Sequence, residues 1–438
     1  MSLAFEPTSS MLEAALRFLE DRGEASGGAV DASERRAAFA RYERMGGALK
    51  LPYRKIAWTS DRKVLPTTPI VAATLDAAGD RPALAVESAG GLAHAGAVCL
   101  QGPPGARDDV RAVVLPLADA RREHPKLLAG VRHAIVRRRS NRFVGLATAF
   151  QNCGAFVFVP SGVILDAPIQ LLWIYRGGRA QAVFPHVVVV LGADARATVI
   201  ERHINEGDAF VCGIVEASVG AGAQLDYVAV QRMGDGARIR MTRAARCEAD
   251  AQAGWHLAEL GAARARTSLD VHLDAPGARA EISALSLHTG VQQTDLSSMV
   301  DHRCERTRSG TVVRFAATDR GHGRYVGTVR IRKGARGSDG SLRADALLLS
   351  KRARIEVKPE LEIGADEVSA FHGASVGSLD EEALFYAGTR GIARSQAVRL
   401  IALAFFEPAV KRFPSAALQD EIRTALDQKI DEATDIEA

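Results

Sequence analysis

Cysteine is scarce and scattered in this sequence. The five cysteines stand at positions 99, 153, 212, 247 and 304, and no two of them form a CxxC pair. This spacing excludes a zinc ribbon and a disulfide framework. An odd, scattered set of thiols is typical of a reducing compartment, so we expect a cytoplasmic protein.

The sequence also lacks an excess of charge and an unbroken apolar span. Its 56 basic and 52 acidic residues give a net charge of only +4, which argues against a nucleic-acid-binding protein. Residues 143–165 carry no formal charge, but Gln151, Asn152 and a turn signal at 160–162 interrupt them. Such groups are costly in lipid, so we expect no membrane partner and no nucleic-acid partner.

Catalytic motifs are largely missing. No GK dipeptide occurs, which excludes a phosphate-binding loop of the GxxxxGK type, and HExxH is absent. The GxSxG run at 373–377 resembles a nucleophile elbow, but the last histidine, His372, precedes its serine, whereas in that fold the histidine follows. We therefore do not expect an enzyme.

The 438 residues are more than one compact core supports, and the pattern of apolar residues changes twice along the chain. Residues 1–142 show helical periodicity, notably at 11–23 and 32–46. Residues 143–368 carry short β-branched runs separated by small residues, which indicate strands. Residues 369–438 become helical again. We expect three domains with these boundaries.

The middle region repeats. Aligned segments place Ala195, Ala223, Ala251 and Ala278 in register, with spacings of 28, 28 and 27 residues. A constant spacing of this size predicts a β-solenoid, in which each coil contacts only its neighbours. The register is lost across RCERTRSGTV at 303–312 and partly recovered at KGARGSDGSL at 333–342, so we expect irregular coils near this end.

The tail from Asp366 to Ala438 carries 13 acidic and 7 basic residues, a net charge of −6. Ser378 followed by Glu381 resembles a capping box at the start of its first helix. Leu384, Phe385 and Tyr386 cannot all lie on one helix face. We therefore expect part of this helix to contact something outside its own domain.

Several motifs carry a family resemblance. The run PELEIGADEVSAFHGASVGSLDEEALFYAGTRGI at 359–392 resembles the SufB/SufD family of the SUF iron–sulfur cluster assembly machinery. VPSGVILDAPIQL at 159–171, DHRCERTRSG at 301–310 and LPYRKIAW at 51–58 support it. HGAS in place of an EHEA-type sequence favours the SufD branch.

The resemblance implies a right-handed parallel β-helix flanked by N- and C-terminal helical domains. It implies a non-catalytic scaffold subunit that pairs with a SufB-like paralogue through the β-helix. A SufC-like ABC ATPase would bind the C-terminal helices. When isolated, the chain could form a homodimer through the exposed β-helix edge.

The family histidine falls on His372, which we expect at a domain junction, offering its imidazole to iron or a transient iron–sulfur cluster at the SufB interface. No cofactor is expected to bind tightly to this chain alone. Many relatives have a cysteine where Ala370 stands, so Glu367 or the partner would complete the site. The expected partner-binding residues are Leu384, Phe385, Tyr386, Arg390, Gly391, Pro359 and Glu360.

Three alternatives stay open. His372 shapes the interface without touching metal, or the chain is a homodimeric SufB-like scaffold, or it is a stand-alone β-helix enzyme that processes polysaccharide. The last would need several carboxylates converging on one face, and the coils show no recurrent aspartate. Cys304 is more readily interpreted as a buried thiol than as a ligand.

Overall fold

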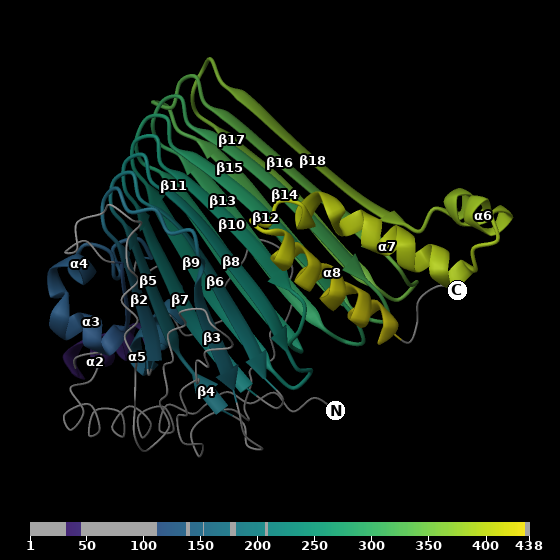
Figure 1. The fold of residues 1–438 in the computed structure, drawn as a ribbon, viewed down its shortest axis with the longest axis horizontal. Helices are drawn as coiled ribbons and strands as arrows, with labels where there is room; N and C mark the ends of the chain where they lie inside the picture. Colours follow the sequence, from purple (N-terminus) through teal and green to yellow (C-terminus); the bar gives the residue numbers. More distant parts are fainter. Residues whose placement is uncertain are drawn as a thin grey trace.

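Two long sheets dominate the computed structural model of the chain (Figure 1). The structure describes residues 32–44, 112–136, 141–151, 153–175, 181–205 and 209–433. The expected helix at 11–23 and the LPYRKIAW motif at 51–58 lie outside these residues. The described part is a parallel β-solenoid with helices at both ends, which confirms the expected fold class.

Strands of consecutive coils stack in two sheets. The first sheet runs β1 (Val113–Pro116), β2 (Cys153–Val159), β5 (Pro185–Leu191), β7 (Ala209–Val219), β9 (Arg238–Cys247), β11 (Arg264–Leu273), β13 (Gln293–His302), β15 (His322–Ile331) and β17 (Arg354–Ile363), with β4 (Gln181–Val183) beside β7. The second runs β3 (Ile169–Tyr175), β6 (Arg196–Asn205), β8 (Gln224–Met233), β10 (Gln252–Glu259), β12 (Arg279–His288), β14 (Arg308–Ala317), β16 (Asp339–Leu348) and β18 (Ser369–Ser378). The β1–β2 pair is antiparallel, and the other strand pairs are parallel. From β6 onward, successive strands alternate between the sheets, so each coil gives one strand to each sheet.

The core lies in the interior of the coils, between the two sheets. Strand β11 alternates between partly exposed and buried positions along its whole length, because successive side chains point to opposite faces. Like residues then stack on the coils before and after. Tyr227 and Trp255, for example, occupy paired positions on β8 and β10, and their rings stack 4.6 Å apart. Burial of this interior column joins the coils without a single globular core.

The repeat found in the sequence is the coil repeat. Ala195, Ala223, Ala251 and Ala278 are all buried and each directly precedes a strand of the second sheet. The carbonyl of each accepts a hydrogen bond from the first strand residue of the next coil, as Ala278 does from Arg308. A larger side chain at this tight corner would displace the stacked backbone, so the position selects small residues.

The expectation of irregular coils after residue 302 is wrong. Thr307 and Ser338 take over the corner position and are fully buried, with their hydroxyl oxygens 2.8 Å apart. The spacing between paired strands rises from 27 residues between β10 and β12 to 29 and then 31 in the next coils. The first increase matches strand β12, which has 10 residues where β10 has 8, and the second lies in the longer turn at 332–338. The strand ladder therefore continues unbroken while the alanine pattern ends.

Helices cover the outer face of the first sheet at its N-terminal end. They are α2 (Ala32–Arg44), α3 (Leu117–Glu123), α4 (Pro125–Ala129) and α5 (Arg142–Phe150). Together with β2, β5 and β7 they form a second apolar cluster that includes Phe150, Phe156 and Phe184. Asn141 caps α5 by accepting from two backbone N–H groups. Residues 143–150, which we assigned to the β-helix, are therefore helical, and the solenoid strands begin at Cys153.

Three helices follow the solenoid: α6 (Glu381–Thr389), α7 (Arg394–Val410) and α8 (Ala416–Asp431). Helices α7 and α8 pack on the outer face of the second sheet, whereas α6 projects away from the solenoid (Figure 1). The expected boundary at 368 is wrong, because Ser369–Ser378 forms β18 in register with β16. Asp380, and not Ser378, caps α6. The longest described helix has 17 residues, and no described helix is long and apolar enough to cross a membrane.

Candidate functional site

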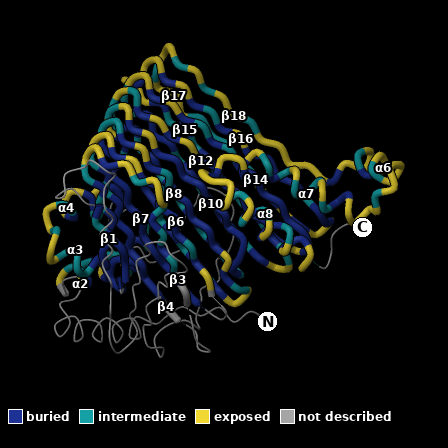
Figure 2. Tube along the Cα trace, viewed as in Figure 1, coloured by how far each residue is buried: buried dark blue, intermediate teal, exposed yellow. Residues whose placement is uncertain are grey.

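The C-terminal end of the solenoid is open. Strands β17 and β18 are the last members of the two sheets, and each pairs with one neighbour among the described strands, β15 and β16 respectively. The other edge of each strand therefore presents backbone N–H and C=O groups. Such edges bind further strands readily. Figure 2 shows β18 largely exposed, in contrast to the buried strands beneath it.

His372 lies on β18 and continues the interior column of the solenoid. It is paired with Leu342, which follows Thr311, Ile282 and Trp255 along the same row. Those four residues are buried, whereas His372 is exposed because no described coil follows it. The expected position at a domain junction is therefore wrong. The imidazole belongs to a regular coil and stands at the open end of its interior.

The surroundings of His372 hold few further ligands. Among the described residues, no group of three or more metal-ligating side chains includes His372. Ala370, two residues earlier on the same face, packs against the interior core. Ser375 of the GxSxG run lies on the opposite face of β18 and donates a hydrogen bond of 2.7 Å to Asp345. Ser375 and His372 thus cannot act together as nucleophile and base.

Two expected partner-binding residues lie on β17, on opposite faces. Pro359 pairs with Gly327 on the interior row, and Glu360 points outward beside Thr328, whose hydroxyl donates to it at 3.1 Å. An ion pair with Lys358 lowers the pKa of Glu360. Pro359 has no N–H, which weakens β17 as a site for strand addition. Strand β18, which has no proline, offers the better edge.

Helix α6 exposes part of its apolar surface. Phe385 is 75% exposed and Tyr386 59%, and Leu400 at the neighbouring helix α7 is 56% exposed. Leu384, in contrast, is 4% exposed and packs with the C-terminal helices, so it contributes little to the exposed surface. This corrects the expectation for Leu384, whose side chain packs within the C-terminal helices.

The remaining tail residues shape this surface. The guanidinium of Arg390 lies 5.1 Å from the centre of the Tyr386 ring and donates to its hydroxyl at 3.0 Å. Gly391 has φ +79°, a conformation that ends the helix and that other residues rarely adopt. Beside them, Phe385 and Gly388 line a hollow together with Glu381, Leu384, Ile392 and Arg394. The tail thus offers a small apolar surface with a rigid aromatic at its rim.

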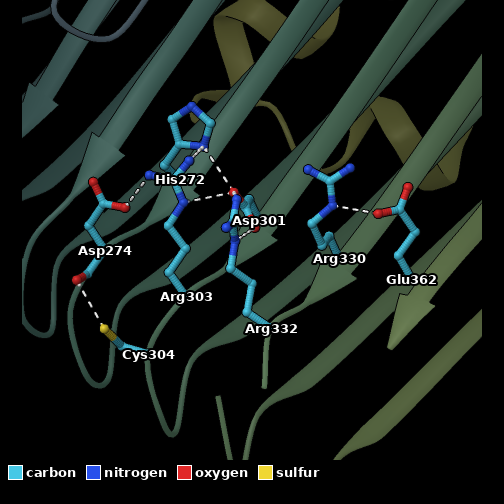
Figure 3. Close-up of polar contacts among 8 residues, drawn as sticks. All are labelled: His272, Asp274, Asp301, Arg303, Cys304, Arg330, Arg332 and Glu362. Carbon is cyan, nitrogen blue, oxygen red and sulfur yellow. Dashed lines mark hydrogen bonds and ion pairs between the residues drawn. The ribbon is translucent and has the colours of Figure 1, made fainter. Parts of the chain in front are cut away.

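A charged ladder crosses the coils where the strands of the first sheet end (Figure 3). The buried carboxylate of Asp301 accepts from Arg303 at 2.7 Å and from Arg332 at 2.8 Å, and His272 lies 3.7 Å away. Burial alone would raise the pKa of Asp301, but contacts from His272, Arg332 and Arg303 hold the pKa well below its usual range. Asp301 is therefore a fixed negative charge that joins three coils.

The ladder extends to the neighbouring coils. Arg303 also donates to Asp274 at 2.7 Å, and Arg330 donates to Glu362 of β17 at 2.5 Å (Figure 3). Cys304 is half-buried, and its thiol donates to the backbone oxygen of Asp274 at 3.0 Å. The expectation of a buried Cys304 is thus only partly met, but the thiol has a hydrogen-bond partner within the fold.

Sequence reasoning missed this ladder although a signal was present. Residues 272, 301 and 330 are 29 positions apart, as are 274, 303 and 332. Charged and polar residues recur with the coil spacing in the segment where the alanine pattern stops. The ladder joins coils by paired charges, and it leaves few carboxylates free for chemistry.

Comparisons with known proteins agree with this architecture. Residues 174–405 match a family model described as SUF system FeS cluster assembly, SufBD core domain. The chain is 26% identical over 295 residues to the iron-sulfur cluster assembly protein SufD of Bacillus subtilis, which covers 66% of this chain and 67% of that protein. It is 25% identical over 277 residues to SufB of the same organism, covering 63% of this chain and 59% of that protein.

A SufBD family protein of Mycobacterium leprae is 27% identical over 264 residues, covering 59% of this chain and 30% of that protein. The matches thus span about two thirds of the relatives' length or less. The identities to SufD and to SufB are nearly equal, so these comparisons identify the family and not the branch. The family model covers more than half of the chain, from the end of β3 into α7. The chain belongs to the SufBD family of the SUF iron–sulfur cluster assembly system.

Proposed function

We propose that this chain is a non-catalytic, SufD-type scaffold subunit of a cytoplasmic complex that assembles iron–sulfur clusters. In this proposal a SufB-like paralogue joins the open end of the solenoid, and a SufC-like ATPase binds the helices that follow it. The observation that carries the proposal is the position of His372, exposed at the open end of a solenoid whose other interior positions in that row are buried.

Strand addition at β18 would extend the second sheet into the partner. The main-chain hydrogen bonds would supply affinity, and the alternating side chains would supply specificity. His372 would then face the first interior row of the partner's solenoid. Imidazole is a ligand for iron, and a thiolate from the partner would be the usual complement. Iron or a nascent cluster is cargo in this scheme, because one imidazole alone holds metal weakly.

The surface around Phe385 and Tyr386 supports ATPase docking. Exposed aromatic side chains near a charged rim are typical centres of protein interfaces. The contact between Arg390 and Tyr386 orders the ring before binding, which lowers the entropy cost of association. Leu384 would support this surface from beneath without touching the partner.

The polysaccharide-processing alternative is not favoured. A glycosidase needs two carboxyl groups that face each other across a substrate cleft. On the outer faces of the described coils, Asp295, Asp301, Asp345 and Glu362 are instead paired with arginines. Neutralised carboxylates of this kind join coils and are poor acids or bases for catalysis.

Co-expression with SufB-like and SufC-like proteins of the same organism tests the proposal. We expect a complex that contains all three chains, hydrolyses ATP and holds iron and sulfide. Val376→Glu, at an exposed position on the same face of β18 as His372, should prevent pairing with the SufB-like chain. The matched control is Val291→Glu, because Val291 is similarly exposed in a turn far from this edge.

His372→Ala separates the ligand from the interface. We expect the complex to keep its mass and its ATPase activity while the yield of iron and sulfide falls. Ser375→Ala, on the opposite face of the same strand, is the control. Unchanged cluster formation in His372→Ala would assign this histidine to shaping the interface, and a complex that forms only as a homodimer of this chain would favour the SufB-like alternative.

A further inference from the structure

A second histidine cluster lies far from the open end, where the N-terminal helices meet the solenoid. It consists of His133 in the turn after α4, His186 on β5 and Glu216 on β7. One ligand atom from each residue lies within 4.8 Å of the others. His186 and Glu216 are buried on the outer face of the first sheet, beneath the helices.

Glu216 is held in place by the backbone of the turn. Its Oε1 accepts from the N–H of His133 at 2.6 Å, and its Oε2 accepts from those of Ile135 at 3.1 Å and Val136 at 2.9 Å. These three bonds fix both oxygens without using either histidine ring. Carboxylates that bind metal ions are themselves held by hydrogen bonds, and Glu216 meets this requirement.

His186 points one nitrogen at this carboxylate and leaves the other without a partner. Its Nε2 lies 3.0 Å from Glu216 Oε1, while its Nδ1 is buried and has no hydrogen-bond partner among the described residues. Burial lowers the pKa of His186, although the contact with Glu216 opposes this shift. The geometry thus offers a ring nitrogen beside the carboxylate and a second ring nitrogen without a hydrogen-bond partner, and imidazole nitrogens are common metal ligands.

The separation of these atoms is close to what a metal ion requires. A tetrahedral ion with bonds of about 2.1 Å holds neighbouring ligand atoms about 3.4 Å apart. The existing Nε2 to Oε1 distance of 3.0 Å would need to widen by only a few tenths of an ångström. The proton now on Nε2 would move to Nδ1 by tautomerisation, so no net proton is released from His186.

His133 has a backbone conformation that is unusual for a non-glycine residue. Its φ is +59°, a value that non-glycine residues rarely adopt and that often accompanies functional sites. This conformation brings its ring centre within 5.0 Å of that of His186. Its Nε2 lies 3.5 Å from Glu34 of α2, a carboxylate that also pairs with Arg132. Glu34 is thus placed to orient the His133 ring.

We propose that His133, His186 and Glu216 form a binding site for one divalent transition-metal ion that fastens the N-terminal helices to the solenoid. Two imidazoles and one carboxylate suit Zn²⁺, Fe²⁺ or Co²⁺ rather than Mg²⁺ or Ca²⁺. The site differs from His372 in being closed and assembled within one chain. It does not depend on the proposed scaffold role.

Co²⁺ titration of the full-length protein, first stripped with a chelator, tests the site directly. We expect one equivalent to produce the visible absorption of tetrahedral Co²⁺ and to raise the unfolding temperature. Zn²⁺ should displace it, and Mg²⁺ should not. His186→Ala and His133→Ala should each weaken Co²⁺ binding at least tenfold, whereas His322→Ala, on β15 and outside both histidine sites, should leave the single tight equivalent unchanged.

The rival account is a hydrogen-bonded junction that needs no metal. In that case the wild-type protein would show no Co²⁺ spectrum, or both histidine variants would keep it. A third result would also overturn the proposal: His186→Ala lowers the unfolding temperature by the same amount in Zn²⁺ and in chelator. Elemental analysis of protein expressed in metal-supplemented medium gives a readout that requires no folding measurement.

Discussion

The first coils of the solenoid and its last coil share one backbone geometry but have opposite surroundings. Every residue of β7 is buried, because the interior lies on one side and the N-terminal helices on the other. Strand β18 has the same parallel pairing, yet most of its residues are exposed. The contrast separates two uses of one fold: contacts at the covered end hold the molecule together, and side chains at the open end are free for partners.

The largest expected effect tests the covered end. Glu216→Ala would leave the buried N–H groups of His133, Ile135 and Val136 unpaired. We expect it to lower the free energy of unfolding by about 3–5 kcal/mol, the typical cost of removing one partner from a buried charged contact. Chemical denaturation measures this change. Glu360→Ala on β17 is the matched control and should cost under about 1 kcal/mol, because its ion pair is solvated; equal costs would remove the contrast.

A pH titration tests the helices that cover the second sheet. Burial lowers the pKa of Lys429 on α8 to about 8, and its Nζ donates to Gln292 at 2.6 Å. The unfolded chain keeps this lysine protonated up to about pH 10.4. Between these values the unfolded state binds more protons, so the contribution of Lys429 to stability rises with pH.

The contribution of Lys429 to the free energy of unfolding rises by about 3 kcal/mol between pH 8 and 10.4, because one pKa unit corresponds to about 1.36 kcal/mol. Denaturant unfolding of wild type and Lys429→Met at several pH values isolates it, since other groups titrate in both proteins. Lys411→Met, at an exposed position, provides the control. If the unfolding free energies of Lys429→Met and Lys411→Met depend on pH in the same way as that of the wild type, Lys429 is not buried against the solenoid.

A substitution in the exposed tail should weaken partner binding without changing the stability of the fold. Phe385→Asp places a charge at a side chain that is 75% exposed, so the unfolding free energy should change by less than about 0.5 kcal/mol. Affinity for the SufC-like ATPase should fall at least tenfold, because a charge is buried when the interface forms. Val291→Asp is the control. ATPase binding that survives Phe385→Asp would move the interface away from α6.

The smallest expected effect is that of His372→Ala on stability, which we compare with a buried histidine of the same solenoid. His302 is buried and contacts the hydroxyls of Thr307 and Ser309 at 2.8 Å each. His302→Ala should therefore cost about 1–3 kcal/mol through lost hydrogen bonds to buried groups. His372→Ala should cost less than about 0.5 kcal/mol, because its side chain is exposed. A comparable loss in both variants would mean that His372 contributes to the fold of the isolated chain.

Sequence reasoning reached the architecture because corner positions tolerate few side chains. Ala195, Ala223, Ala251 and Ala278 mark the same place in successive coils, so spacing alone revealed the solenoid. The pattern failed at Thr307, because a hydrogen-bonded pair with Ser338 replaced the small apolar residue. The β-branched runs that predict strands could not locate the boundary at 378 either. Strand β18 consists mostly of small and polar residues, as an exposed edge allows.

The candidate sites were harder to infer. His372 was found through resemblance, but its place at the end of the interior column depends on strand pairing that only the structure gives. Leu384 was wrongly assigned to the interface because three adjacent apolar residues do not reveal which one faces the core. His133, His186 and Glu216 are 53 and 30 positions apart, with no periodic relation that would single them out.

The uneven length of the coils has a consequence for how this family can change. Paired strands are separated by 29 residues between β12 and β14 and by 31 between β14 and β16, and this difference lies in the turn before the later strand, which lengthens from 303–307 to 332–338. An insertion in a turn leaves each strand side chain on its own face and adds little closure entropy. One residue inserted within a strand would exchange inside for outside along the rest of that strand. Alignment gaps among relatives should therefore collect at the corners, and deletion scanning should find that corners tolerate length changes which strands reject.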